Sequence, residues 1–172
     1  MAGTKLLRGN FSVYAFYPEA VSDWSTLTAS ALNTAVTNGL GFALTDDSVS
    51  INLTDSDTDD SISICDIGNV STPTFFNYEV SFDSFRNGPV SAGPQVAVYE
   101  LPVDLFGNVD QPFYILKRIG VPQGTTFAAG QIVSVFGVKT DWFQNVLGDG
   151  ENILFGSRFK ASGQVYTNAT LA

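Results

Sequence analysis

The sequence predicts an antiparallel, mostly β domain with one or two helices. Two observations carry this prediction: apolar and polar residues alternate along several short segments, and turn-forming residues separate those segments. A length of 172 residues fits one domain, and a composition of 44% hydrophobic and 15% charged residues is that of a globular protein. We therefore expect residues 1–172 to form a single domain.

The first half of the chain has four strand signals and one helix signal. The expected strands are the aromatic segment that Pro18 ends, two short alternating segments and the longest alternating segment of the chain: Phe11–Tyr17, 49–53, 61–64 and Phe75–Phe85. Between the first two strands, apolar residues recur at helical spacing from Trp24 to Val36. We expect Asp23 to cap this helix and Asn38-Gly39 to end it.

The second half contains further strands and one ambiguous apolar segment. Residues 95–106 show helical spacing, but Pro102 is expected to break a regular helix there. The segments expected as strands are Phe113–Ile119, Gln131–Thr140 and Gln164–Leu171. Asp149-Gly150 predicts a hairpin between Trp142–Val146 and Ile153–Phe159.

The net charge of −9 lies entirely in the first half of the chain. Residues 1–8 carry two bases, Lys5 and Arg8, whereas residues 9–85 carry eleven acids and no base. From Arg86 to the end, six bases balance six acids. A chain with this balance does not bind nucleic acid by neutralising phosphates.

The residue inventory excludes several kinds of catalysis. Histidine is absent and Cys65 is the only cysteine, so Ser/His/Asp triads, Cys/His nucleophiles and zinc sites of His and Cys ligands are excluded. A carboxylate-based hydrolase needs two acids facing each other across a cleft, and no spacing here supports such a pair. We assign no catalytic, cofactor-binding or metal-binding residue, and expect no cofactor.

One acidic segment leaves a second hypothesis open. Residues 55–66 carry acids at positions 1, 3, 5 and 12 of an EF-hand-like window, although Asp60 stands where that loop needs glycine and Asp66 is shorter than the usual glutamate. The simpler interpretation is a solvated acidic loop. The alternative is a calcium-dependent β-sandwich binding module built around this segment.

The start of the chain and its hydropathy indicate a location. No signal peptide follows Met1, and no segment approaches the about 18 apolar residues that a membrane span needs. We therefore expect the protein to be made and kept in a reducing cytosol.

Four segments of the chain, in this order, resemble a known family. They are Ser63–Arg86, including Ser-Ile-Cys-Asp-Ile-Gly-Asn and Thr-Pro-Thr-Phe-Phe-Asn-Tyr-Glu, then Lys117–Gly120, Phe127–Val135 and Lys139–Asp141. Together they are similar to the major tail tube proteins of long, non-contractile-tailed bacteriophages, of the type that infects actinobacteria. The similarity runs from about Asp23 to the C-terminus. The family usually has a helix in the 95–106 region, where this chain has Pro102.

The resemblance implies both a fold and an assembly. The fold is an antiparallel β-sandwich or partial barrel with one or two flanking helices. The assembly consists of hexameric rings stacked into a tube, whose lumen conducts double-stranded DNA during genome ejection without binding it specifically. The implied partners are further copies of the chain and the tape measure, tail terminator and distal tail proteins, with no membrane. The implied location is the virion tail, assembled in the host bacterial cytoplasm, and the family has no catalytic residue.

Joined to this resemblance, the one-sided charge of the first half predicts a site. Ordinary solvated surfaces mix both signs of charge, so an acidic block of this kind is expected to face either the DNA channel or the contact between rings. The candidate residues are Asp46, Asp47, Asp55, Asp57, Asp59 and Asp60.

Overall fold

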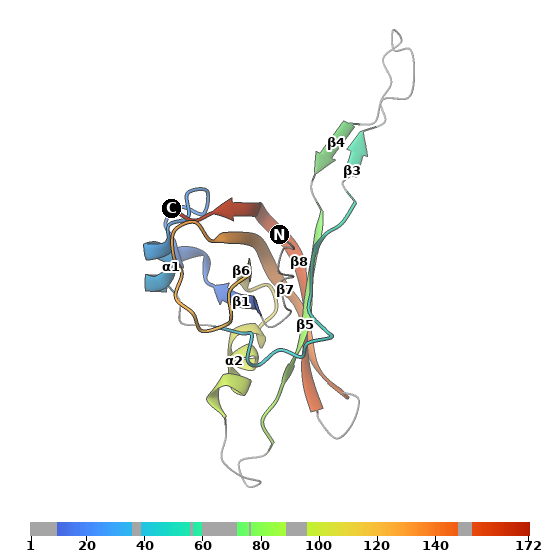
Figure 1. Ribbon diagram of the computed structural model, residues 1–172. Helices are drawn as coiled ribbons and strands as arrows, with labels where there is room; N and C mark the ends of the chain where they lie inside the picture. The colour runs from blue at the N-terminus through green and yellow to red at the C-terminus, as the bar shows by residue number, and fades with distance from the viewer. Residues whose placement is uncertain are drawn as a thin grey trace, which may run out of the picture.

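A computed structural model describes residues 10–35, 39–55, 57–59, 72–75, 77–88, 96–147 and 153–172 (Figure 1). The fold is mainly β, as predicted, with two α-helices among the described residues. The elements in chain order are β1 (Phe11–Phe16), the 3₁₀ turn η2 (Pro18–Ala20), α1 (Ala29–Ala35), β2 (Ser50–Leu53), β3 (Asp57–Asp59), β4 (Thr72–Phe75), β5 (Tyr78–Phe85), α2 (Ala97–Phe106), β6 (Pro112–Ile119), β7 (Ile132–Leu147) and β8 (Ile153–Thr170).

Six strands form one curled sheet. Their order is β1-β6-β7-β8-β5-β2, every neighbouring pair is antiparallel, and the sheet bends into a half-barrel (Figure 1). β3 and β4 make a separate two-stranded sheet. Because β3 follows β2 and β4 precedes β5, this narrow pair prolongs the β2–β5 edge and projects beyond the main sheet as an arm (Figure 1).

The concave side of the sheet holds the larger core. Side chains from all six strands and from α2 meet there. Phe106 of α2 is fully buried, and its ring centroid lies 5.5 Å from that of Phe82, 5.0 Å from that of Phe113 and 5.0 Å from that of Phe159. Edge-to-face aromatic pairs of this kind are each worth about 0.5–1.5 kcal/mol beyond the area they bury. The helix is therefore anchored inside the half-barrel.

A second core covers the convex side over β1, β6, the first half of β7 and the end of β8. There α1 and the segment before it bury Trp24, whose ring stacks on Tyr114 with centroids 4.2 Å apart. Successive strand residues point to opposite faces, so Val13 enters the concave core while Tyr14 enters the convex one. At this end of the sheet both faces are buried.

Residues 39–45 close the gap between the two edges of the half-barrel. Leu40 N donates to Val13 O of β1 at 2.9 Å, and Thr45 N donates to Asp83 O of β5 at 2.9 Å. Inside the barrel, Lys117 Nζ donates to Ile51 O of β2 at 2.8 Å. Burial lowers the pKa of Lys117 from its ordinary value. The curl is thus fixed by backbone contacts and by one lysine from the opposite wall.

Several predicted strands are confirmed, and others have different limits. β1, β2 and β6 match their predicted segments. The predicted strand Phe75–Phe85 is wrong as a single strand, because β4 and β5 pair in different sheets. β7 continues past Thr140 through a register shift, and β8 contains both the predicted hairpin strand and the predicted final strand. The β7–β8 hairpin is confirmed by the pairing of Leu147 with Ile153, while its turn and the predicted strand at 61–64 lie outside the described residues.

The first predicted helix starts later than its spacing indicated. α1 begins at Ala29, and Thr28 Oγ1 accepts the Ala31 N–H at 3.1 Å, so the residue that caps the helix is Thr28. Asp23 instead closes a local turn by accepting Ser25 N–H at 2.8 Å, with further bonds from the Ser25 and Thr26 hydroxyls. Those hydrogen bonds lower the pKa of Asp23 to about 2. The turn brings Trp24 into the convex core without a helix.

The expectation that Pro102 breaks the second helix is wrong. α2 runs through Pro102 from Ala97 to Phe106. A proline removes one backbone donor from a helix, and here its ring is buried while the next turn delivers Leu105 and Phe106 to the core. Tertiary packing outweighs the local penalty.

Arg118 of β6 is fully buried beneath the loop that joins β6 to β7. Its guanidinium donates to Thr125 O at 2.8 Å, Tyr14 OH at 3.0 Å and Pro122 O at 3.2 Å, and it lies 4.4 Å from the Phe127 ring centroid. Among the described residues every acceptor of this cation is uncharged, and its Nε has no partner. Burial lowers the pKa of Arg118, but an arginine stays charged. The cation therefore holds the loop by charge-assisted bonds to neutral groups.

We expect Arg118→Met to lower the free energy of unfolding by about 3 kcal/mol or more, since it strands buried carbonyls that the guanidinium satisfies. Urea denaturation of the unassembled protein measures the change. Lys139→Met is the matched control, because Lys139 is a partly exposed β7 cation and its loss should change stability by less than about 1 kcal/mol. A loss at Arg118 no larger than in the control would show that the guanidinium bonds are not stabilising.

Candidate functional site

Among the described residues, part of the main sheet is uncovered on its convex side. On β2, β5, the second half of β7 and β8 up to Lys160, only the concave side belongs to a hydrophobic core. The opposite side of these strands carries residues of alternate positions, which the register sets beside one another. They are Ser50, Asn52, Glu79, Ser81, Asp83, Trp142, Gln144, Gly156, Arg158 and Lys160. We call this surface the open face.

The two cations of the open face are paired with carboxylates. Arg158 Nη1 lies 2.9 Å from Asp83 Oδ1 across the β5–β8 pair, and its guanidinium lies 5.2 Å from the Trp142 ring centroid. Lys160 Nζ lies 3.1 Å from Asp141 Oδ1 of β7. Each of these two cations thus has a carboxylate of the same chain beside it.

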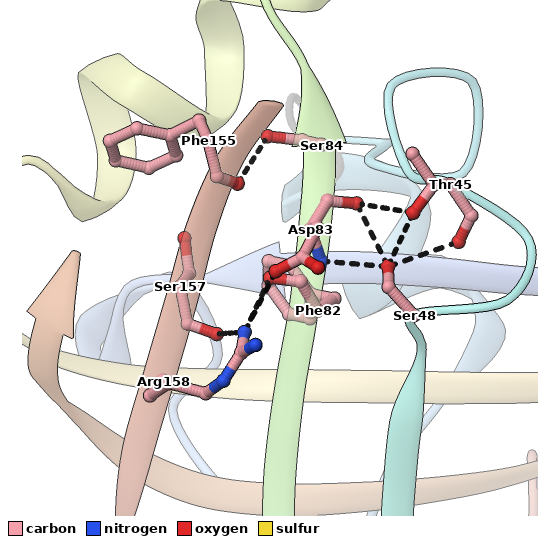
Figure 2. A network of polar contacts seen from close by, with 8 residues as sticks. All are labelled: Thr45, Ser48, Phe82, Asp83, Ser84, Phe155, Ser157 and Arg158. Carbon is pink, nitrogen blue, oxygen red and sulfur yellow. Dashed lines mark hydrogen bonds and ion pairs between the residues drawn. The ribbon is translucent and has the colours of Figure 1, made fainter. Parts of the chain in front are cut away.

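A hydrogen-bond network joins the open face to the turn at 45–48. Figure 2 shows the Ser48 hydroxyl between Thr45 and the backbone of Asp83. Asp83 N donates to Ser48 Oγ at 2.8 Å, and Thr45 Oγ1 donates to Asp83 O at 3.2 Å. The same Asp83 presents its carboxylate to Arg158, so the backbone of one residue fixes the turn while its side chain fixes the cation.

The outer strands of the sheet differ in whether the backbone groups of their free edge are bonded. The outer edge of β1 is capped, because Val13 N donates to Gln123 Oε1 at 3.0 Å and Val13 O accepts from Leu40. β7 pairs with β6 only as far as Lys139, and Thr140 still bonds to Asp110 and Gln111, so residues 141–147 have a strand on one side alone, that of β8. β2 likewise has β5 as its one strand neighbour among the described residues, although Ile51 O accepts from Lys117 Nζ. The open face therefore ends in two strand edges without a partner strand, at β2 and at residues 141–147.

The structure separates the acidic residues that the sequence singled out. Exposed Asp46 and Asp47 lie in the turn before β2, whereas exposed Asp55 follows β2 at the start of the arm. Asp57 and Asp59 begin and end β3 of the arm, and Asp60 lies outside the described residues. β2 therefore has acids at both ends, and they do not form one cluster.

No described residues form a metal site. Among the parts of the chain placed in the structure, no group of three or more His, Cys, Asp or Glu side chains could hold an ion. Most of the segment behind the calcium hypothesis, residues 60–66, lies outside those parts. In the same parts, no helix is both long and apolar enough to cross a membrane.

The residues that organise the open face were not singled out by sequence reasoning. Asp83 stood on the polar side of the predicted alternation in 75–85, which was the one available signal. Its partner Arg158 is distant in the chain, and nothing in local spacing indicates that β5 and β8 are neighbours.

Comparison with known proteins gives a family match. A family model described as phage tail tube protein matches residues 1–172, the whole chain. No curated protein matches the chain.

Proposed function

The chain belongs to the phage tail tube protein family, and we propose that its copies form hexameric rings that stack into a tube and conduct double-stranded DNA. It is a structural protein of the virion tail. The observation that carries the proposal is the open face, a polar four-stranded surface that ends in two unpaired edges. In this proposal residues 1–172 act as one tail tube domain.

The two unpaired edges supply the contact within a ring. An exposed strand edge presents unpaired N–H and C=O groups and is a template for pairing with another chain. Residues 141–147 of one copy would pair with β2 of the next, and repetition around a ring would close these edges as a barrel does. The capped β1 edge takes no part, because its Val13 groups are already bonded.

The open face would then line the channel. Cations that face phosphates attract DNA by releasing counterions, and a tube repeats any such attraction at every ring. On this face Arg158 and Lys160 are each paired with a carboxylate. A wall with its positive charges neutralised in this way lets DNA slide.

The arm would reach the neighbouring ring. It projects beyond the main sheet (Figure 1), so Asp55, Asp57 and Asp59 lie away from the open face. We therefore assign these acids to the contact between rings and not to the channel wall. At the ends of the tube the same surfaces would meet the terminator and distal tail proteins, with the tape measure in the channel, during assembly in the host cytoplasm.

Cysteines placed on the two edges should join neighbouring copies. In a Cys65→Ser background, Asn52→Cys combined in turn with Trp142→Cys, Gln144→Cys or Val146→Cys should give covalent oligomers up to hexamers on oxidation of rings, read by denaturing electrophoresis. Scanning three positions allows for the unknown register. Asn52→Cys with Val109→Cys, an exposed site between α2 and β6, should stay monomeric. If tubes form but no combination cross-links, the ring contact lies elsewhere.

Removing the partner of a channel cation should slow DNA. Asp141→Asn leaves Lys160 unpaired, and virions built with it should eject DNA severalfold more slowly, most clearly at low salt, where screening is weakest. Stability should change by less than about 1 kcal/mol, because the pair is partly exposed. Asp141→Asn/Lys160→Gln restores the net charge and should restore the rate. An ejection rate that neither variant alters would mean that this pair does not face the channel.

Reversing the charge of the arm should stop stacking while rings still form. We expect Asp55→Lys/Asp57→Lys/Asp59→Lys to give rings but few tubes in electron microscopy, because the contact between rings changes sign. Glu19→Lys/Asp104→Lys/Asp110→Lys alters the net charge equally at three exposed acids elsewhere and should stack normally. Tubes of normal length that conduct DNA slowly would place the three arm acids in the channel instead.

A further inference from the structure

A groove lies between β1, residues 41–49 and the β6–β7 loop. Its volume is about 470 Å³. The apolar residues that line it are Phe11, Val13, Phe42, Leu44, Val49 and Pro122. Phe42 is 61% exposed, which is high for a phenylalanine that belongs to a concave surface. Val13 and Leu44 also belong to the larger core, whereas the proposed ring contact does not use this groove.

Hydrogen bonds within the protein hold the walls of the groove in place. Gln123 crosses its floor to accept Val13 N–H at 3.0 Å, and a Cβ on Gly41 would come within 2.5 Å of the Gln123 amide oxygen. A side chain at position 41 would therefore have to displace the Gln123 amide from Val13. Pro122 O is held at 3.2 Å by the buried Arg118. A groove fixed from several sides costs little further ordering when a segment binds.

One rim of the groove is acidic. Asp46 lines it, and Asp47, which is also exposed, follows in the chain. A segment that fits the groove should therefore have apolar side chains for its floor and positive charge for its rim.

The residues just before β1 have this chemistry. Lys5-Leu6-Leu7-Arg8 places two leucines between two bases, and these are the only bases in the first 85 residues. Asn10 O accepts Gly120 N–H at 2.7 Å, which fixes where the segment leaves β1. Leu7 is four residues from Phe11, a reach of up to about 13 Å. Since Phe11 itself lines the groove, the segment is long enough to enter it.

We propose that the groove is the docking site for residues 5–8 of the same chain, with the leucines against Phe42 and Val49 and the bases toward Asp46 and Asp47. This inference does not depend on the tube. It would cover the exposed Phe42, and it would give Asp46 and Asp47 a role within the subunit, apart from the channel and the contact between rings.

A disulfide tests the docking directly. Leu7→Cys/Val49→Cys in the Cys65→Ser background should oxidise within the monomer, with loss of both free thiols and no change in oligomeric mass. Leu7→Cys/Val109→Cys, with the second cysteine at an exposed site outside the groove, should oxidise at least tenfold more slowly. Covalent dimers as the main product, or equal rates for the two pairs, would overturn the proposal.

A second measurement leaves the apolar residues of the groove unchanged. Deleting residues 2–8 should raise hydroxyl-radical labelling of Phe42 severalfold, and Leu6→Ser/Leu7→Ser should do the same. Asp46→Asn/Asp47→Asn should raise it less and should remove its dependence on salt. Labelling of Phe42 that is unaffected by the deletion would show that residues 5–8 do not cover the groove.

Discussion

The curl of the main sheet is the constraint on which the rest of the structure depends. A strand has two faces, and a curled sheet needs a core on its concave side along its whole width. Here α2 fills the concave side, and Phe106 packs against rings from three strands. On the convex side, the second core covers β1, β6, the first half of β7 and the end of β8. The open face exists because the second core does not extend over β2, β5 and the adjoining parts of β7 and β8.

Arg118 links the packing of the convex core to the bonding of the β1 edge. The buried cation holds the β6–β7 loop through Pro122 O and Thr125 O. The same loop supplies Gln123, whose side chain accepts the outward N–H of Val13. The hydrogen bonds of the buried Arg118 therefore position the loop whose Gln123 caps the β1 edge. β2 and residues 141–147 have no such loop among the described residues, and in the proposed ring they take a partner strand.

The distribution of charge in the folded protein differs from its distribution along the sequence. Counted along the sequence, the first half is acidic and the second is balanced. In the structure, Asp83 from the acidic half pairs with Arg158 from the balanced half. Asp47 and Asp55 are only eight positions apart in the sequence, but they lie at opposite ends of β2. The field that a passing phosphate meets is set by these pairs. Net charge alone does not describe it.

The fold class, the strands β1, β2 and β6, and the β7–β8 hairpin could be predicted from the amino-acid sequence, because alternation and turn residues are local signals. Specific segments of the sequence also indicated the family. The capping of α1 by Thr28 and not by Asp23, and the continuation of α2 through Pro102, depend on tertiary packing, since burial of a few side chains outweighs local preference. The open face could not be predicted either. Strand neighbours are chosen by long-range burial and not by spacing, so the meeting of Asp83 with Arg158 exists only once the sheet has curled.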